Sequence, residues 1–169
     1  MLADVLAACV EVAPTVLVTS DEEASSLADE LGVDVVRDPG GGQGAAVAAG
    51  LAHFDGRPLL VLNADLPRAR PRDLLTLFGT APPGGMALVP ARDGTTNALV
   101  LPDRLAFASL YGPGSAEGFR RHGEWLGLDV VVARIPNLVE DVDTMDDLGR
   151  PEGLGPRTRD ALAPARPLS

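Results

Sequence analysis

The sequence predicts an α/β domain in which a largely parallel β-sheet is covered by helices on both faces. Short apolar runs rich in β-branched residues alternate with stretches of helical periodicity, an order typical of such sheets. The chain has 169 residues, 46% of them hydrophobic and 22% charged, which suffices for a packed core and argues against disorder. We assign residues 1–150 to one domain and residues 151–169 to a C-terminal tail that packs on it or trails from it.

The first half of the chain is expected to alternate helices and strands. Ser20 followed by Glu23 has the spacing of a capping box, so a helix begins there and ends before Gly32 at its C′ position. Pro71 suits the first turn of a later helix. In chain order the expected elements are a helix over 2–12, a strand over 15–19, a helix over 20–31, a strand over 33–37, a helix over 45–54, a strand over 58–63 and a helix over 71–78.

The second half of the chain changes character. Two strands, over 86–90 and 96–101, are joined by a short loop and predict a hairpin. A glycine-rich turn from Gly112 to Ser115 opens a helix that ends at Leu126, with Ser115 as its N-cap. Further expected elements are strands over 129–135 and 139–143, a helix over 144–149 and at most a short helix in the tail.

Charge and composition exclude several classes of function. The 14 basic and 24 acidic residues give a net charge of −10, which disfavours nucleic acid or a membrane surface as a partner. All the basic residues are arginine, so neither a Schiff-base lysine nor a P-loop lysine is present. With one cysteine and two histidines, a bound metal would have mainly carboxylate ligands, as Mg²⁺, Mn²⁺ or Ca²⁺ prefers. We see no signal peptide or membrane-spanning run, and we expect a cytoplasmic protein.

Candidate metal ligands gather where predicted strands end, which is where ligands bind in sheets of this class. Asp65 follows an apolar strand and can hold a hydrated cation, although an Asp that starts the turn before Pro67 fits equally well. Asp141 and Asp143 lie two apart on an expected strand, so their carboxylates share one face and their repulsion favours a cation. Helix capping by Thr144 is the alternative, but it leaves Asp141 unexplained. Such carboxylates suit metal-assisted phosphoryl transfer.

Two glycine-rich loops are candidate ligand sites. The loop over 40–44 leads into a helix, so its N–H groups favour anions and the amide of Gln43 could read a base edge; a flexible connector is the alternative. The turn over 112–115 offers a similar anion nest, or an ordinary tight turn. Thr96 and Asn97 add a polar run at the start of a strand.

Other notable residues are assigned to structure. We expect Cys9 to pack as a small apolar residue, and Arg120 and Arg121 to lie on a solvated helix face. We expect His122 and Trp125 to lie partly in the core.

Four motifs occur in series, and their order is more specific than any one of them. They are NADLP (63–67), DGTTNALVL (93–101), YGPGS (111–115) and EDVDTMDDL (140–148). In this order they resemble the guanylyltransferase family of coenzyme F(420) biosynthesis. Members of that family transfer GMP from GTP to 2-phospho-L-lactate, phosphoenolpyruvate or a related phosphorylated three-carbon acid, and release pyrophosphate. The resemblance runs from about residue 15 to residue 162, and it includes LGPRTRDAL (154–162).

The resemblance implies a three-layer, Rossmann-like nucleotidyltransferase fold with a mostly parallel, mixed sheet. It also implies magnesium as cofactor, GTP and a phosphorylated three-carbon acid as partners, and it allows a homodimer. By this resemblance, the catalytic and metal-binding acids would be Asp65, Asp141 and Asp143. The phosphorylated acid would be bound by Gly112 and Ser115, together with Thr96 or Asn97. The guanine base would lie near Gly42, Gln43 and Gly44.

The sequence departs from the family pattern at several points. Family members normally begin with a further strand and a basic loop, whereas this sequence starts at the expected first helix. Arg70 stands before Pro71 where members often have threonine, which predicts a weaker helix cap. Gln43 stands where members often have asparagine. Two alternatives therefore stay open: a related nucleotidyltransferase of the molybdopterin type, and a degenerate, non-catalytic module that binds a nucleotide or metabolite.

Overall fold

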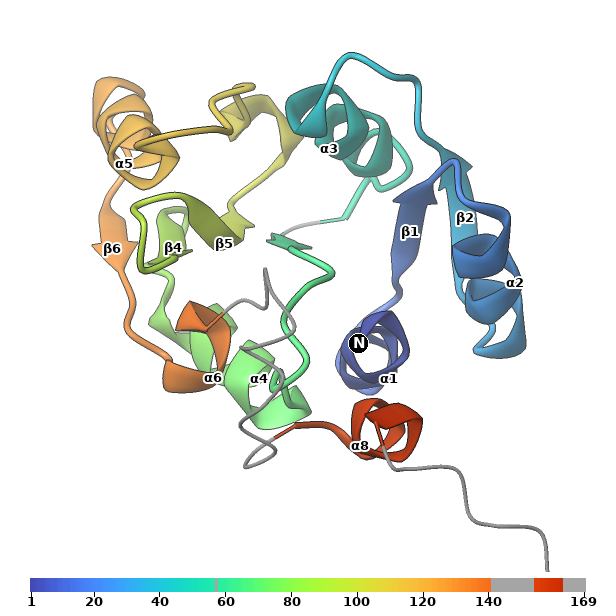
Figure 1. Cartoon of the computed structure of the whole chain (residues 1–169). Coiled ribbons are helices and arrows are strands. Elements are labelled where there is room, and N and C mark those ends of the chain that lie inside the picture. The colour runs from blue at the N-terminus through green and yellow to red at the C-terminus, as the bar shows by residue number, and fades with distance from the viewer. Residues whose placement is uncertain (57, 141–153, 163–169) are drawn as a thin grey trace, which may run out of the picture.

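The computed structural model of the chain has an α/β fold, with helices on both sides of its sheets (Figure 1). The structure describes residues 1–56, 58–140 and 154–162. Within these ranges, no helix combines the length and the apolarity that crossing a membrane requires.

The elements follow the predicted alternation. In the first half they are α1 (Leu2–Val10), β1 (Val16–Thr19), α2 (Glu22–Glu30), β2 (Asp34–Arg37), α3 (Gln43–Leu51), β3 (Leu59–Leu62) and α4 (Pro71–Thr80). In the second half they are β4 (Met86–Pro90), β5 (Thr96–Leu101), the 3-10 helix η1 (Arg104–Ala106), α5 (Ser115–Trp125), β6 (Val130–Val132), α6 (Pro136–Val139) and α8 (Pro156–Leu162).

The described strands form two sheets. The larger sheet has the strand order β3-β5-β4-β6, and in it β5 alone runs against the other strands. β1 and β2 pair in parallel as a separate sheet, with Val16 opposite Asp34 and Thr19 opposite Arg37. The prediction of a mixed, mostly parallel arrangement is confirmed. In Figure 1, β1 and β3 are the neighbouring edges of the two sheets, and no strand pairing joins them.

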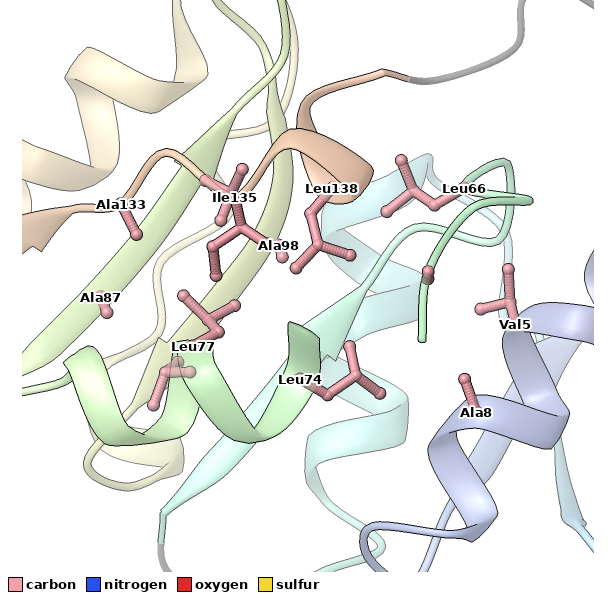
Figure 2. Packing of buried hydrophobic residues seen from close by; sticks show 13 residues of the cluster. Val5, Ala8, Leu66, Leu74, Leu77, Ala87, Ala98, Ala133, Ile135 and Leu138 are labelled. Carbon is pink, nitrogen blue, oxygen red and sulfur yellow. The ribbon is translucent and has the colours of Figure 1, made fainter. Parts of the chain in front are cut away.

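Alternation along β4 and β5 supplies side chains to two cores on opposite faces of the larger sheet. The first core packs against α1, α4 and α6, and its sheet residues are Ala87, Val89, Ala98 and Val100. The second core packs against α3 and α5, and its residues from β4 and β5 are Met86, Leu88, Leu99 and Leu101. Figure 2 shows the first core, where Leu74 and Leu77 of α4 and Leu138 of α6 meet the sheet. The two faces of the sheet are therefore both buried, as the apolar strands predict.

Two helices connect the two sheets through their side chains. α1 places Val5 in the first core, while Leu6, on another side of the same helix, joins a third cluster with residues of α2. α3 places Leu51 in the second core and packs Gly50 against β1. A Cβ on Gly50 would lie 2.8 Å from Cγ2 of Val18, so this close approach requires glycine.

The C-terminal helix α8 is held by a buried carboxylate of α1. Oδ1 of Asp4 accepts a hydrogen bond from the Arg157 N–H at 3.1 Å. Its Oδ2 accepts from the N–H and the hydroxyl of Thr158, at 2.7 Å and 2.6 Å. A Cβ on Gly155 would lie 2.2 Å from the carboxyl carbon of Asp4, so glycine is needed beside it. The predicted short helix in the tail is confirmed, and it packs on the domain.

The local predictions at the start of α2 and at Val139 are wrong. Asp21, and not Ser20, is the N-cap of α2, because the Asp21 carboxylate accepts a hydrogen bond from the Ala24 N–H at 2.8 Å. Val139 lies at the end of α6 and not in a strand, since Pro136 at the first helical turn favours a short helix there.

Trp125 was expected partly in the core, but it is 80% exposed. Phe119 and Gly123, four residues apart, form the face of α5 that touches the sheet. Trp125 follows Gly123 by two positions and therefore lies on the other side of the helix. The helix face that carries Arg120 and Arg121 is solvated, as predicted, and both pair with Glu117.

Candidate active site

One edge of the larger sheet collects most of the predicted site residues. Because β5 is antiparallel to β3, the start of β5 lies beside the end of β3. The backbone N–H of Asn63, just after β3, donates a hydrogen bond to the Asn97 carbonyl at 2.9 Å. The segment that leads to Asp65 and the polar start of β5 at Thr96 are therefore neighbours.

Thr96 and Ser115 form a buried hydroxyl pair at this edge. Their Oγ atoms are 3.0 Å apart, and the residues are 1% and 2% exposed. Gly112 and Gly114 have φ values of +123° and +73°, which glycine adopts readily. Gly114 is the N-cap of α5, and Ser115 is its first helical residue and not the cap that we predicted. The structure therefore brings Thr96 and Ser115 together at a helix N-terminus, where the helix dipole favours an anion.

Asn97 has a different environment from Thr96. It is 1% exposed, and its side-chain amide donates to the carbonyls of Leu138 and Val139, at 3.0 Å and 3.3 Å. These bonds join β5 to α6. Of the two alternatives at the start of β5, Thr96 therefore faces Ser115, while the amide of Asn97 holds the end of α6.

A glycine-rich loop leads into α3, as expected, but the helix begins at Gln43, two residues before the predicted start at residue 45. Gly40, Gly41 and Gly42 have φ values of +77°, +92° and +89°, so the loop needs glycine at each of them. Gly42 is the N-cap of α3, and Gln43 is its first residue, with an exposed side chain. Gly44 is buried, and a Cβ there would lie 1.7 Å from Oγ of Ser109. Gly44 thus allows close packing of α3 on the loop before α5, while Gln43 is the residue available to a ligand.

The acid cluster is described only in part. Asp65 lies in the loop after β3, partly buried, with a buried Oδ1 atom. Asp141 and Asp143 lie outside the described residues. Among the residues that are described, no three His, Cys, Asp or Glu side chains form a metal-binding group. The convergence of the three aspartates remains a prediction.

Sequence reasoning missed Glu140, which forms two salt bridges at the same edge of the larger sheet. Its carboxylate accepts hydrogen bonds from Arg68, in the loop that carries Asp65, and from Arg92, in the turn between β4 and β5. The end of α6 is thereby tied to two other loops of the edge. The opposite charges of Arg68, just after the NADLP motif, and of Glu140, the first residue of EDVDTMDDL, are the one sequence signal that could have suggested this contact.

Two titratable groups flank the Thr96–Ser115 pair. Hydrogen bonds from the hydroxyl and the backbone N–H of Thr95 lower the pKa of Asp93 in the turn before β5. Burial raises the pKa of Tyr111, whose ring packs edge-on against Phe119 with ring centres 5.1 Å apart. Tyr111 stays neutral at physiological pH and fixes the chain just before Gly112. These groups shape the turns beside the hydroxyl pair.

Comparisons with known proteins agree on the class of protein. Residues 1–127 match the MobA-like NTP transferase domain. A phosphoenolpyruvate guanylyltransferase of Nocardia farcinica is 39% identical over 92% of this chain and 72% of its own length. One of Streptomyces coelicolor is 35% identical over 95% of this chain and 77% of its own length. A solved nucleotidyl transferase from a Methanothermobacter species superposes with a TM-score of 0.64, at 21% identity, over 94% of this chain and 78% of that one.

Proposed function

The chain belongs to the MobA-like NTP transferases and, among them, to the phosphoenolpyruvate guanylyltransferase family, and we propose that it transfers GMP from GTP to phosphoenolpyruvate in coenzyme F(420) biosynthesis. The related acid 2-phospho-L-lactate is the other acceptor to test. The two alternatives from the sequence, a molybdopterin-type transferase and a non-catalytic module, are not favoured by relatives of 35–39% identity that share one name. Cytoplasmic location and a homodimer stay predictions.

The observation that carries the proposal is the buried pair of Thr96 and Ser115 at the N-terminus of α5. Two hydroxyl groups at the start of a helix, whose dipole favours a negative charge, suit the phosphate of a small acid. The glycine-rich loop and Gln43 stand at the start of a second helix, α3, and suit the nucleotide. The side chain of Asn63 links the glycine-rich loop to the hydroxyl pair, because it hydrogen-bonds both to the side chain of Gln43 and to the backbone carbonyl of Thr96.

In the proposed reaction, an oxygen of the acceptor's phosphate attacks the α-phosphorus of GTP, and the bond to pyrophosphate breaks. The protein's own part is mainly to position two anions, which agrees with the absence of a nucleophilic triad in the sequence. Thr96, Ser115 and the turn at Gly112 would orient the acceptor's phosphate. The glycine-rich loop would hold the nucleotide so that the α-phosphorus faces that oxygen.

Magnesium fits the donor set that we propose. Asp65 offers a partly buried carboxylate at the sheet edge, and carboxylate oxygens are the ligands that Mg²⁺ prefers. Asp141 and Asp143 would complete the site. When bound, the ion would neutralise the charge that the two phosphate groups bring together.

The test is pyrophosphate release with GTP, Mg²⁺ and each of the two acids, with a downstream transferase present to trap the labile product. We expect Asp65→Asn to lose nearly all turnover. Ser115→Ala should raise the KM for the acid by roughly tenfold, because one hydrogen bond to an anion is lost. Asp55→Asn, at a fully exposed side chain, is the matched control and should keep wild-type rates. If neither phosphoenolpyruvate nor 2-phospho-L-lactate gives pyrophosphate release, the proposal is refuted.

A further inference from the structure

The side chain of Asn63 connects α3 to β5. Its Oδ1 accepts a hydrogen bond from Nε2 of Gln43 at 2.9 Å. Its Nδ2 donates to the backbone carbonyl of Thr96 at 3.2 Å and lies 3.5 Å from Oδ1 of Asn97. A single amide thus touches the residue next to the glycine-rich loop and the residue that pairs with Ser115.

The backbone carbonyl of Thr96 fixes which way the Asn63 amide points. A carbonyl can only accept a hydrogen bond, so the nitrogen of Asn63 has to face it. A flipped amide would place two oxygens, those of Asn63 and Thr96, against each other. The Oδ1 of Asn63 therefore faces Gln43.

The orientation of Asn63 in turn fixes the amide of Gln43. Because Oδ1 of Asn63 is an acceptor, Gln43 must turn its Nε2 toward it, and Oε1 of Gln43 points away from this contact. The Gln43 side chain is exposed, and Oε1 receives no hydrogen bond from the part of the chain that is described. The protein thus presents a hydrogen-bond acceptor beside the glycine-rich loop.

We propose that Asn63 is a positioning residue for base selection, which holds Gln43 so that its Oε1 accepts hydrogen bonds from a guanine base. This rests on the proposed function, in which the nucleotide lies at the loop. The pairing edge of guanine carries donors on N1 and on its 2-amino group, whereas adenine has an acceptor at N1. An acceptor that is held opposite N1 and the 2-amino group bonds to guanine, whereas it opposes the N1 of adenine, whose donor on this edge, the 6-amino group, lies on the other side of N1.

The test measures nucleotide binding, which does not depend on turnover. Ribose-labelled fluorescent GTP and ATP are titrated against the wild-type chain, and the ratio of the two Kd values gives the base preference. We expect a preference for GTP in the wild type. Asn63→Ala should reduce it by roughly tenfold, since a freed Gln43 can turn either end of its amide to the base. Gln43→Leu should reduce the preference by as much, and the double variant should add little, because both changes remove one interaction.

Asn137→Ala is the matched control. It also removes a side-chain amide that bonds within the protein, here to Oδ2 of Asp73 at 2.9 Å, and should keep the preference for GTP. An unchanged preference in Asn63→Ala, or an equal loss in Asn137→Ala, overturns the proposal. Should Asn63→Ala not fold, Gln43→Leu at an exposed position decides, and an unchanged preference there also overturns it. Base preference without pyrophosphate release would instead refute only the proposed function.

Discussion

The contact between Asp4 and α8 allows a stability prediction with a magnitude. Asp4 is 6% exposed, and its carboxylate accepts hydrogen bonds from two backbone N–H groups and one hydroxyl. A hydrogen bond to a charged group contributes about 1.5–3 kcal/mol, and such values do not add fully. We therefore expect Asp4→Ala to lower the free energy of unfolding by about 2–4 kcal/mol, because it leaves the start of α8 without its acceptors.

Urea unfolding followed by far-UV circular dichroism is the suitable assay, since the single tryptophan, Trp125, is 80% exposed and its fluorescence would change little. Thr158→Val removes the hydroxyl bond alone and should cost about 1 kcal/mol. In a double-mutant cycle the two changes should couple, because they share one carboxylate. A loss below about 0.5 kcal/mol for Asp4→Ala would refute the reasoning, since that is the range of ordinary surface substitutions.

Three further predictions concern other parts of the chain. Gly44→Ala should cost about 1–3 kcal/mol in urea unfolding through overpacking against Ser109, and Ser109→Gly should restore most of it; no restoration would contradict the packing argument. Burial raises the pKa of Cys9 to about 11, so a disulfide reagent at pH 8 should react slowly with the native chain and rapidly in urea; equal rates would contradict this. Hydrogen bonds from Arg120 and then Arg121 lower the pKa of Glu117 from 4.5 to about 2, so its contribution to stability is present above pH 4.5 and lost as the pH falls through 2. Glu117→Gln should remove that part of the pH dependence of unfolding, and an unchanged profile would count against the ion pairs.

Local sequence patterns were sufficient for most of the fold. The bounds of β4 and β5 agree with the prediction, because each is an apolar run with turn residues on both sides. Gly32 has the positive φ, +68°, that its place after α2 required. Arg70 was expected to cap α4 weakly, and Asp73 in the first turn of that helix stabilises its start instead, because the Arg70 N–H donates a hydrogen bond to Oδ2 of Asp73 at 3.1 Å. Such features depend on neighbours in the sequence, so they can be read from it.

The side chains that connect distant segments could not be predicted in the same way. Asp4 is an acid in the first turn of α1, and its partner Thr158 stands 154 residues away. Asn63 was visible only as part of a motif, and its contact with Gln43 spans 20 residues. Glu140 likewise depends on Arg68, 72 residues away. Which of many polar residues meet is decided by the packing of the elements, which local periodicity does not contain.

The division of the strands between two sheets has a consequence for motion. Since no backbone ladder runs from β1 to β3, side chains of α1 and α3 couple the two blocks within the described residues, and the smaller block should open more readily than the larger one. Amide protons of β1 and β2 should then exchange with deuterium sooner than those of β4 and β5. The glycine-rich loop follows β2, while Thr96 begins β5, so a ligand that spans both would clamp the blocks and slow exchange in the smaller one.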